Sequence, residues 1–203
     1  MERVTGGHFC PKRRRRMEQY LLVSAAPVLT GAKPSALMSF QRCCKHIWKD
    51  CGAALCQAAG LHALAFPQGA DSFSILLYSR SALESHVKTQ GAQALLTKYG
   101  YPSGATLSEL LERLQARFAA ERFPHEIGVF LGYPPEDVAA FIQRGGRDYL
   151  CCRYWKVYHN EKRAREAFRF IDEARERARL LLSRQMPLLA AAQRLAQSGG
   201  YAE

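Results

Sequence analysis

The chain has 203 residues, which fits one medium-sized domain whose apolar core can form without a metal or a disulfide. Apolar residues make up 48% of the sequence, close to the globular average, which excludes disorder for the chain as a whole. The formal net charge is +11, but six of the cations lie in residues 1–16. Because the remainder is only mildly basic, the charge by itself does not indicate a nucleic-acid-binding protein.

The sequence contains neither a recognisable targeting signal nor a disulfide framework of cysteines, which is typical of a cytoplasmic protein. No apolar run approaches the length of a transmembrane helix, and the basic start is not followed by the apolar segment of a signal peptide. We therefore expect a cytoplasmic protein that does not bind a membrane. The seven cysteines are odd in number and lack framework spacing, so we expect neither a disulfide nor a structural zinc.

The composition divides the chain into three segments. Residues 1–16 have no apolar periodicity and end in four arginines, which predicts a disordered basic extension, and Met17 is an alternative start of the protein. Residues 17–184 are expected to form a single domain. Residues 185–203 are rich in alanine and end in glycines, which predicts a frayed helix.

The first elements of the domain alternate between helix and strand. A short amphipathic segment from Met17 is expected to end in a turn made by Pro27 and Gly31, before a strand at 35–40. Apolar residues at helical spacing then predict a helix that Gly60 ends. Residues 61–66 and 72–78 are separated by turn residues and predict a β-hairpin.

The second half of the chain is predicted to be mostly helical. Helical segments are expected at 81–98, and Thr106 with Glu109 forms a capping-box pattern that opens another helix. Two short helices are expected at 123–132 and 134–142, followed by a strand at 149–158. Asn160 is expected to cap a long helix. The predicted fold is α+β, with a small antiparallel sheet covered by helices and a helix-rich C-terminal half. The sheet is expected to contain four strands, at about 35–40, 61–66, 72–78 and 149–157.

Two vicinal cysteines in the aromatic segment are the first candidates for chemistry. Cys151 and Cys152 should point to opposite faces of a strand, and Cys152 should share its face with Lys156. A neighbouring ammonium group can lower the pKa of a thiol and make it reactive. A thiol packed on a half-buried strand is the alternative. Cys44 and Cys51 lie on an apolar helix face and are expected to be buried structural thiols.

His125 and Glu126 form a second candidate pair, at the predicted start of a helix. An imidazole in this position could act as a general base or a ligand. The simpler reading is that Glu126 complements the helix dipole and that His125 is merely exposed. The signatures of phosphate-binding loops, dinucleotide folds, zinc proteases and serine hydrolases are absent from the sequence.

The long C-terminal helix carries many arginines, which could contact phosphates of nucleic acid together with the arginines at 13–16. However, acidic residues are interleaved with them, and Glu161–Arg165 and Glu173–Arg177 have the i,i+4 spacing of ion pairs. A solvated helix face whose charges pair with one another is therefore the preferred interpretation. Nucleic acid is the less favoured partner.

Several blocks of the sequence resemble the bacterial domain-of-unknown-function family 3793 (DUF3793). They run in order from Met17 to about Ile171. The blocks are Phe-Pro-His-Glu-Ile-Gly-Val-Phe-Leu-Gly-Tyr-Pro at 123–134, Tyr-Trp-Lys-Val-Tyr at 154–158, Ala-Pro-x-Leu-x-Gly-x-Lys at 26–33, Leu-Leu-Tyr at 76–78 and Tyr-Gly-Tyr-Pro at 99–102. Relatives usually have cysteine where this chain has Ala25 and glycine where it has Arg153, which argues against a thiol-pair mechanism.

The resemblance implies a small cytosolic bacterial protein linked to redox or metal metabolism, with a flavodoxin-like or iron-handling partner. Together with the residue types, it favours a protein or small enzyme that binds an anionic or planar small molecule or cofactor, whose identity stays open. A nucleic-acid-binding protein and a structural interaction partner are the alternatives. The candidate site comprises Lys33, His125, Glu126, Cys152, Trp155, Lys156 and Tyr158.

Overall fold

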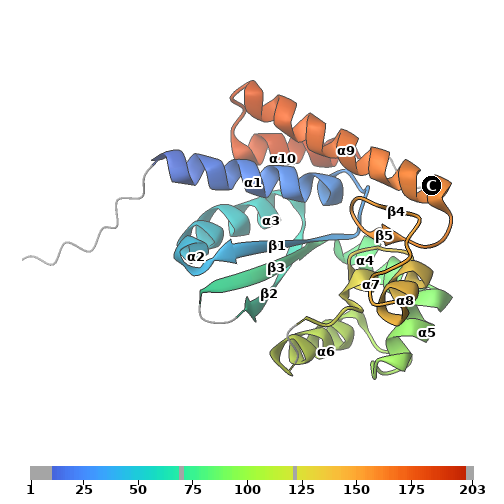
Figure 1. Ribbon diagram of the computed structural model, residues 1–203. Coiled ribbons are helices and arrows are strands. Elements are labelled where there is room, and N and C mark those ends of the chain that lie inside the picture. The colour runs from blue at the N-terminus through green and yellow to red at the C-terminus, as the bar shows by residue number, and fades with distance from the viewer. Residues whose placement is uncertain (1–10, 69–70, 121–122, 200–203) are drawn as a thin grey trace, which may run out of the picture.

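The computed structural model describes residues 11–68, 71–120 and 123–199 (Figure 1). It is an α+β protein, as predicted, with a small antiparallel sheet between two groups of helices. Among the described residues, no helix is both long enough and apolar enough to cross a membrane.

The main sheet has three antiparallel strands, β1 (Ser35–Gln41), β2 (His62–Gln68) and β3 (Ser72–Tyr78), in the order β1-β3-β2. The predicted hairpin is confirmed, because β2 pairs with β3. Ile75 of β3 lies opposite Met38 of β1 and Ala65 of β2. The central strand is therefore β3, which explains its unbroken apolar sequence.

Successive residues of β3 enter two different cores, one on each face of the sheet. Ile75 and Leu77 belong to one core, and Leu76 and Tyr78 to the other. This alternation follows from the period of two residues in a strand. The sheet is thus covered by helices on both faces.

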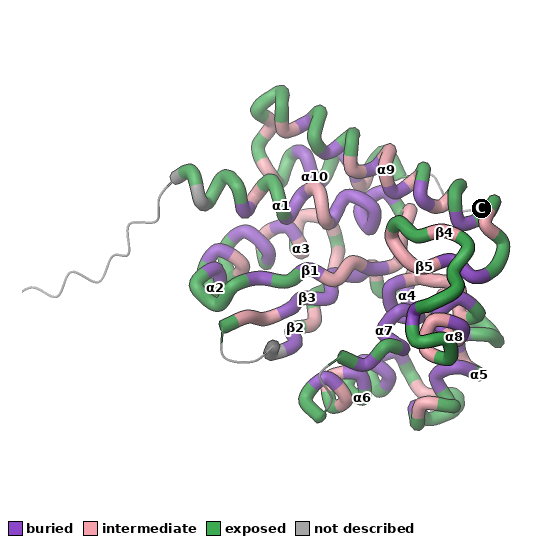
Figure 2. Tube along the Cα trace, viewed as in Figure 1, coloured by how far each residue is buried: buried purple, intermediate pink, exposed green. Residues whose placement is uncertain are grey.

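The first face of the sheet is covered by helices from both ends of the chain: α1 (Pro11–Leu29), α9 (Glu161–Ser183) and α10 (Leu188–Gln197), together with α3 (Ala53–Ala59) (Figure 1). Fully buried alanines allow these helices to approach closely: Ala25, Ala26, Ala174, Ala178, Ala191 and Ala192. Buried residues recur along one side of α9, at the helical period that the sequence predicts (Figure 2).

Two terminal segments differ from the sequence-based expectation. Residues 11–16, which we expected to be disordered, begin α1, whereas residues 1–10 lie outside the described part. The expected frayed tail contains the helix α10, whose Leu195 is buried in the first core. Helix α1 also continues through Pro27 to Leu29, so that the turn begins later than predicted. Burial of apolar residues in the first core accounts for α10 and for the continuation of α1 to Leu29, whereas residues 12 and 14–16 are exposed.

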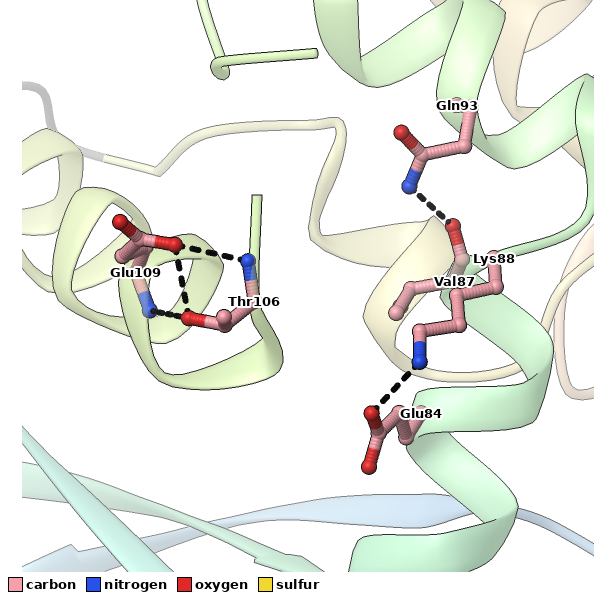
Figure 3. A network of polar contacts seen from close by, with 6 residues as sticks. All are labelled: Glu84, Val87, Lys88, Gln93, Thr106 and Glu109. Atoms are coloured by element: carbon pink, nitrogen blue, oxygen red, sulfur yellow. Dashed lines mark hydrogen bonds and ion pairs between the residues drawn. The ribbon is translucent and has the colours of Figure 1, made fainter. Parts of the chain in front are cut away.

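The second face of the sheet is covered by the middle of the chain. These helices are α4 (Arg80–Val87), α5 (Gln90–Lys98), α6 (Leu107–Ala120), α7 (Ile127–Phe130) and α8 (Pro135–Gln143). The predicted capping box is present, because the Thr106 amide donates to Glu109 Oε2 at 2.7 Å (Figure 3). The Gln93 side chain donates to the Val87 carbonyl at 2.7 Å and holds α5 against α4 (Figure 3).

The segment predicted as one helix before Gly60 is broken into four pieces. These are η1 (Arg42–Cys44), α2 (Lys45–Ile47), the π-helical turn η2 (Trp48–Gly52) and α3. A Cβ atom on residue 52 would lie 2.5 Å from the Trp48 ring, so glycine lets the indole lie against the backbone. The helix ends at Gly60, as predicted, with a positive φ of 64°.

The prediction that residues 149–157 form a fourth strand of the main sheet is wrong. Residues 149–158 instead form a separate hairpin of two short strands, β4 (Cys151–Cys152) and β5 (Lys156–Val157). Its buried Val157 packs with Ala164 and Phe168 at the start of α9. The aromatic run therefore has its own small core, which the periodicity of a single strand could not reveal.

Candidate functional site

A cavity of about 350 Å³ lies between α7, α8 and the β4–β5 hairpin. Apolar and aromatic side chains form most of its wall, with a few charged groups from the hairpin. This combination of an apolar wall and few polar groups is typical of small-molecule sites. The lining residues that the argument uses are Phe123, His125, Tyr133, Phe141, Cys152, Arg153, Tyr154, Trp155 and Lys156.

Stacked aromatic rings build one wall of this aromatic pocket. The rings of Tyr133 and Trp155 are stacked, with centroids 5.1 Å apart, and Trp155 meets the edge of Phe168 at 4.5 Å. Gly128 of α7 also lines the pocket, and a Cβ atom there would lie 2.8 Å from Val138. The absence of a side chain at Gly128 therefore lets α7 and α8 pack closely beside the cavity.

Asp137, in the first turn of α8, fixes the hairpin against this helix. Its carboxylate is buried and accepts hydrogen bonds from the Trp155 indole at 2.9 Å, the Tyr158 amide at 2.8 Å and the His159 amide at 2.9 Å. These bonds satisfy a buried charge and set the orientation of the indole. Asp137 lines the pocket, but its role is to position Trp155.

Four of the seven candidate residues meet at the aromatic pocket: His125, Cys152, Trp155 and Lys156. The His125 ring is exposed and lies 5.3 Å from the Phe141 ring, centroid to centroid. Cys152 is exposed. Residues from two blocks that are about 27 positions apart in the sequence are thus brought to one cavity.

Cys152 and Lys156 are neighbours for a different reason from the one predicted. They are Cα partners across the β4–β5 hairpin, not residues on one face of a single strand. The Lys156 ammonium donates to the Gly146 carbonyl at 2.6 Å and lies 4.9 Å from the centre of the Tyr149 ring. Its charge is therefore directed at a carbonyl and an aromatic ring, and nothing in this geometry indicates an activated thiolate at Cys152.

Glu126 does not line the pocket and has structural partners. Its carboxylate is buried, forms an ion pair with Arg117 and accepts a hydrogen bond from the Tyr101 hydroxyl at 3.2 Å. Burial, together with the negative charge of Glu126, raises the pKa of Tyr101. The carboxylate joins α6 to the start of α7, so its geometry supports a structural role and not that of a general base.

Tyr158 also lies outside the pocket lining. Its ring is buried, with the Arg144 guanidinium 5.3 Å from the ring centre. Its hydroxyl is buried and has no hydrogen-bond partner among the described residues. Tyr158 contributes to the site through its backbone amide, which donates a hydrogen bond to Asp137.

Lys33 lies behind the pocket wall, against Tyr133. Its ammonium is 5.0 Å from the centre of the Tyr133 ring. Burial, reinforced by the positive charge of Arg175, lowers the pKa of Lys33 to about 8. Burial also raises the pKa of Tyr133 to about 12. Lys33 is therefore close to the candidate site without lining its cavity.

The cysteines that the structure describes are all free thiols. Cys44 and Cys51 are buried in the first core, as predicted. The Cys51 thiol donates to Glu18 at 3.6 Å, and burial raises its pKa. In the described part of the chain, no cluster of three or more histidine, cysteine or acidic side chains could hold a metal ion.

The exposed arginines of α9 are largely matched with acids of the same helix. Arg165 pairs with Glu161 at 2.5 Å, Arg169 with Glu173 at 3.1 Å and Arg179 with Glu176 at 3.1 Å. These are i,i+3 and i,i+4 pairs on a solvated surface. The predicted Glu161–Arg165 pair is present, and Glu173 pairs with Arg169, four residues before it.

Sequence reasoning missed several residues that shape the site. Tyr133 and Asp137 are not among the candidate residues that the sequence suggests. Phe123 and Phe141 were not selected at all. The available signal for Phe123 and Tyr133 was their position inside the block at 123–134, but only the folded chain shows that they line the pocket.

The fold and the cavity define the class: an α+β protein with a two-sided helical cover and an aromatic pocket beside a small hairpin. The chain belongs to the family described as "Protein of unknown function (DUF3793)", whose model matches residues 21–190. No curated protein and no solved structure matches it.

Proposed function

We propose that this protein binds a small planar molecule with an anionic group in the aromatic pocket, as a ligand- or cofactor-binding protein or small enzyme. The observation that supports this most directly is the convergence of His125, Cys152, Trp155 and Lys156 on one cavity with aromatic walls. In line with the family resemblance, the proposal places the protein in the bacterial cytoplasm, in redox or metal metabolism. A flavodoxin-like or iron-handling protein is the proposed partner.

The size and wall of the cavity support a planar ligand. A volume of about 350 Å³ lies at the lower end of the range for small-molecule pockets and suits a molecule of two or three fused rings. Aromatic side chains favour such rings, because offset and edge-to-face contacts add to the burial of apolar surface. Tyr133, Phe141 and Trp155 offer these contacts.

The charges at the pocket support an anionic group on the ligand. Arg153 and Lys156 line the cavity, and both are cations: Arg153 is paired with Asp172 at 2.9 Å, whereas Lys156 donates to the uncharged Gly146 carbonyl. The acidic residue in the lining, Asp137, is already occupied by three donors of the protein. An acidic group on a ligand would therefore meet positive charge, whereas a cationic ligand would lack a free acceptor.

If the protein is an enzyme, His125 is the group best placed to transfer a proton. It lines the cavity and is exposed, and its ring nitrogens form no hydrogen bond or ion pair with the described residues. An imidazole titrates near neutral pH, as a general acid or base requires. Cys152, at the same cavity, is the candidate nucleophile.

Fluorescence titration tests the proposal. The chain has two tryptophans, so Trp48→Phe leaves Trp155 as the reporter in the pocket wall. Flavin mononucleotide and 1-anilinonaphthalene-8-sulfonate are suitable planar anionic probes. We expect saturable quenching of Trp155, and Phe141→Ala should weaken binding about tenfold or more, since it removes one aromatic wall.

Tyr20→Ala provides the matched control, because Tyr20 is an exposed aromatic residue on α1, outside the pocket lining. This variant should bind as the wild type does. Anaerobic purification followed by an absorbance spectrum would also show a retained chromophore. Absence of saturable binding, or equal effects of Phe141→Ala and Tyr20→Ala, would contradict the proposal.

A further inference from the structure

Two cations that lie behind the aromatic pocket have no acidic partner among the residues that the structure describes. The first, Lys33, follows α1, and its position is set by close packing. A Cβ atom on Gly132 would lie 2.4 Å from Pro34, so the turn after α7 rests directly on the residue next to Lys33. The Ser35 hydroxyl donates to the Phe130 carbonyl at 2.6 Å and fixes the same contact. This packing places the Lys33 ammonium against the Tyr133 ring.

The second cation is Arg175 of α9. Its guanidinium lies 4.7 Å from the centre of the Tyr154 ring, and its Nε is buried without a hydrogen-bond partner in the described part of the chain. The positive charge of Arg175 acts on both Lys33 and Tyr133. Tyr133 stacks on Trp155, the chain neighbour of Tyr154, so the two cations lie against neighbouring rings of the aromatic wall.

Neither charged group is neutralised by the described residues. The Lys33 ammonium and the Arg175 guanidinium form no ion pair with any of them, in contrast to the exposed arginines of α9. Asp172, three residues before Arg175, is already engaged by the Tyr154 hydroxyl at 2.6 Å and by Arg153 at 2.9 Å. Two partly buried like charges without a counter-charge are unfavourable for folding.

We propose that Lys33 and Arg175 form a binding site for an oxyanion, the phosphate or carboxylate group of a small molecule. An arginine guanidinium presents a planar set of donors that matches such groups, and a lysine ammonium adds a compact positive charge. The bound anion supplies the counter-charge that the described residues do not. This site is independent of ligand binding in the aromatic pocket, although Tyr133 contacts both.

Thermal unfolding with inorganic phosphate tests the site. Phosphate replaces chloride at constant ionic strength, so that general screening stays unchanged. We expect phosphate to raise the melting temperature of the wild type by several degrees, through binding to the folded state. Lys33→Met and Arg175→Met should abolish this rise. Arg169→Met, on the same helix but paired with Glu173, should retain it.

The variants have a second signature that an ordinary structural contact would not produce. Without phosphate, Lys33→Met should unfold at a higher temperature than the wild type, since it removes one of two neighbouring like charges. Higher stability combined with loss of the phosphate response distinguishes a binding site from a structural contact. A Lys33→Met protein that is less stable than the wild type would contradict the inference.

Amine labelling provides a readout that does not depend on stability. A limiting amount of an amine-reactive reagent near pH 8 should modify Lys33 in the wild type, and phosphate should protect this residue selectively, as measured by mass spectrometry of its peptide. Succinate in place of phosphate distinguishes a carboxylate site from a phosphate site. Equal protection of all lysines, or no protection of Lys33 by either anion, would overturn the proposal. Neither result depends on the planar probes of the aromatic pocket.

Discussion

The indole nitrogen of Trp155 donates a hydrogen bond to Oδ2 of Asp137, and this 2.9 Å contact joins the hairpin to α8. The other carboxylate oxygen accepts hydrogen bonds from the backbone amides of Tyr158 and His159. One buried side chain thus holds both the backbone after β5 and the aromatic ring that forms the pocket wall. The shape of the pocket depends on Asp137 even though the acid is not free to bind a ligand.

Replacement of Asp137 should loosen this connection. Asp137→Ala leaves three donors without their acceptor, and we expect it to lower the free energy of unfolding by about 3–5 kcal/mol. Asp137→Asn keeps one oxygen acceptor and should cost less. Urea unfolding followed by circular dichroism measures both. A cost below about 1 kcal/mol for Asp137→Ala would show that the hairpin is held mainly by other contacts.

The Glu126–Arg117 pair should behave as a structural unit. Glu126→Ala leaves Arg117 partly buried without this partner and should cost about 3–5 kcal/mol of stability. The double change Glu126→Leu with Arg117→Met should recover much of that loss, because it removes both charges. Chemical denaturation of the three proteins provides the comparison. If Glu126→Gln folds normally but abolishes turnover of an identified substrate, the structural assignment is wrong.

Two glycines with positive φ offer a matched test of the packing next to Lys33. Gly132 has a φ of 76°, and a Cβ atom there would lie 2.4 Å from Pro34; Gly60 has a φ of 64° with nothing within 4 Å. Gly60→Ala should therefore cost only the conformational penalty, about 1–2 kcal/mol. Gly132→Ala should cost clearly more, about 3 kcal/mol or above, because of the added collision. Similar losses in urea unfolding would mean that Pro34 can move aside easily.

The lowered pKa of Lys33 predicts a pH dependence with a definite sign. The pKa is about 8 in the folded protein, against an ordinary value of 10.5. Between these values the unfolded chain binds more protons than the folded protein, so stability rises with pH by about 1.4 kcal/mol or less for each pH unit. Below about pH 8 both states are protonated, and the folded protein bears the full cost of the buried charge.

Comparison with Lys33→Met isolates this effect from the other titrating groups. Without phosphate, the variant should be more stable near pH 7, and the difference should shrink as the pH rises from about 8 to 10.5. Urea unfolding over this range measures the two curves. A difference that stays constant with pH would show that Lys33 titrates normally in the folded protein.

Thiol labelling tests whether Lys156 activates Cys152. Cys152 is exposed and should react readily with a thiol reagent, whereas the buried Cys44 and Cys51 should react slowly. Because Lys156 donates to the Gly146 carbonyl, Lys156→Met should change the labelling rate of Cys152 by less than about threefold. Peptide mass spectrometry at several reaction times follows each cysteine. A much larger decrease would restore the hypothesis of a lysine-activated thiolate.

Much of the fold was predictable because local signals agreed with the final packing. The capping box at Thr106, the end of a helix at Gly60 and the alternation in 72–78 all act over a few residues. The predictions failed where contacts between residues distant in the sequence determine the structure. Helix α10 is held by burial against α1 and α3, and the hairpin at 151–157 is held by Asp137 and Phe168.

The candidate site was predictable in part, for the same reason. Dense motif blocks identified His125, Cys152, Trp155 and Lys156, which do share a cavity. They could not separate these residues from Glu126 and Tyr158, because the partners of both lie more than ten residues away or in another element. The roles of Asp137 and Tyr133 depend on contacts with the hairpin and with Lys33, which no sequence period encodes.

The position of α10 also constrains the order in which the protein can fold. Leu21, Leu22, Ala25 and Ala26 of α1 share a core with Ala191, Ala192 and Leu195, which are made about 170 residues later. During synthesis the apolar stripe of α1 therefore stays partly uncovered until α10 has been made. The core on the other face draws only on residues between 37 and 142 and can form earlier. Of the two cores, the one closed by α10 is the one that a ribosome-bound chain leaves exposed, and it is where a chaperone would be needed first.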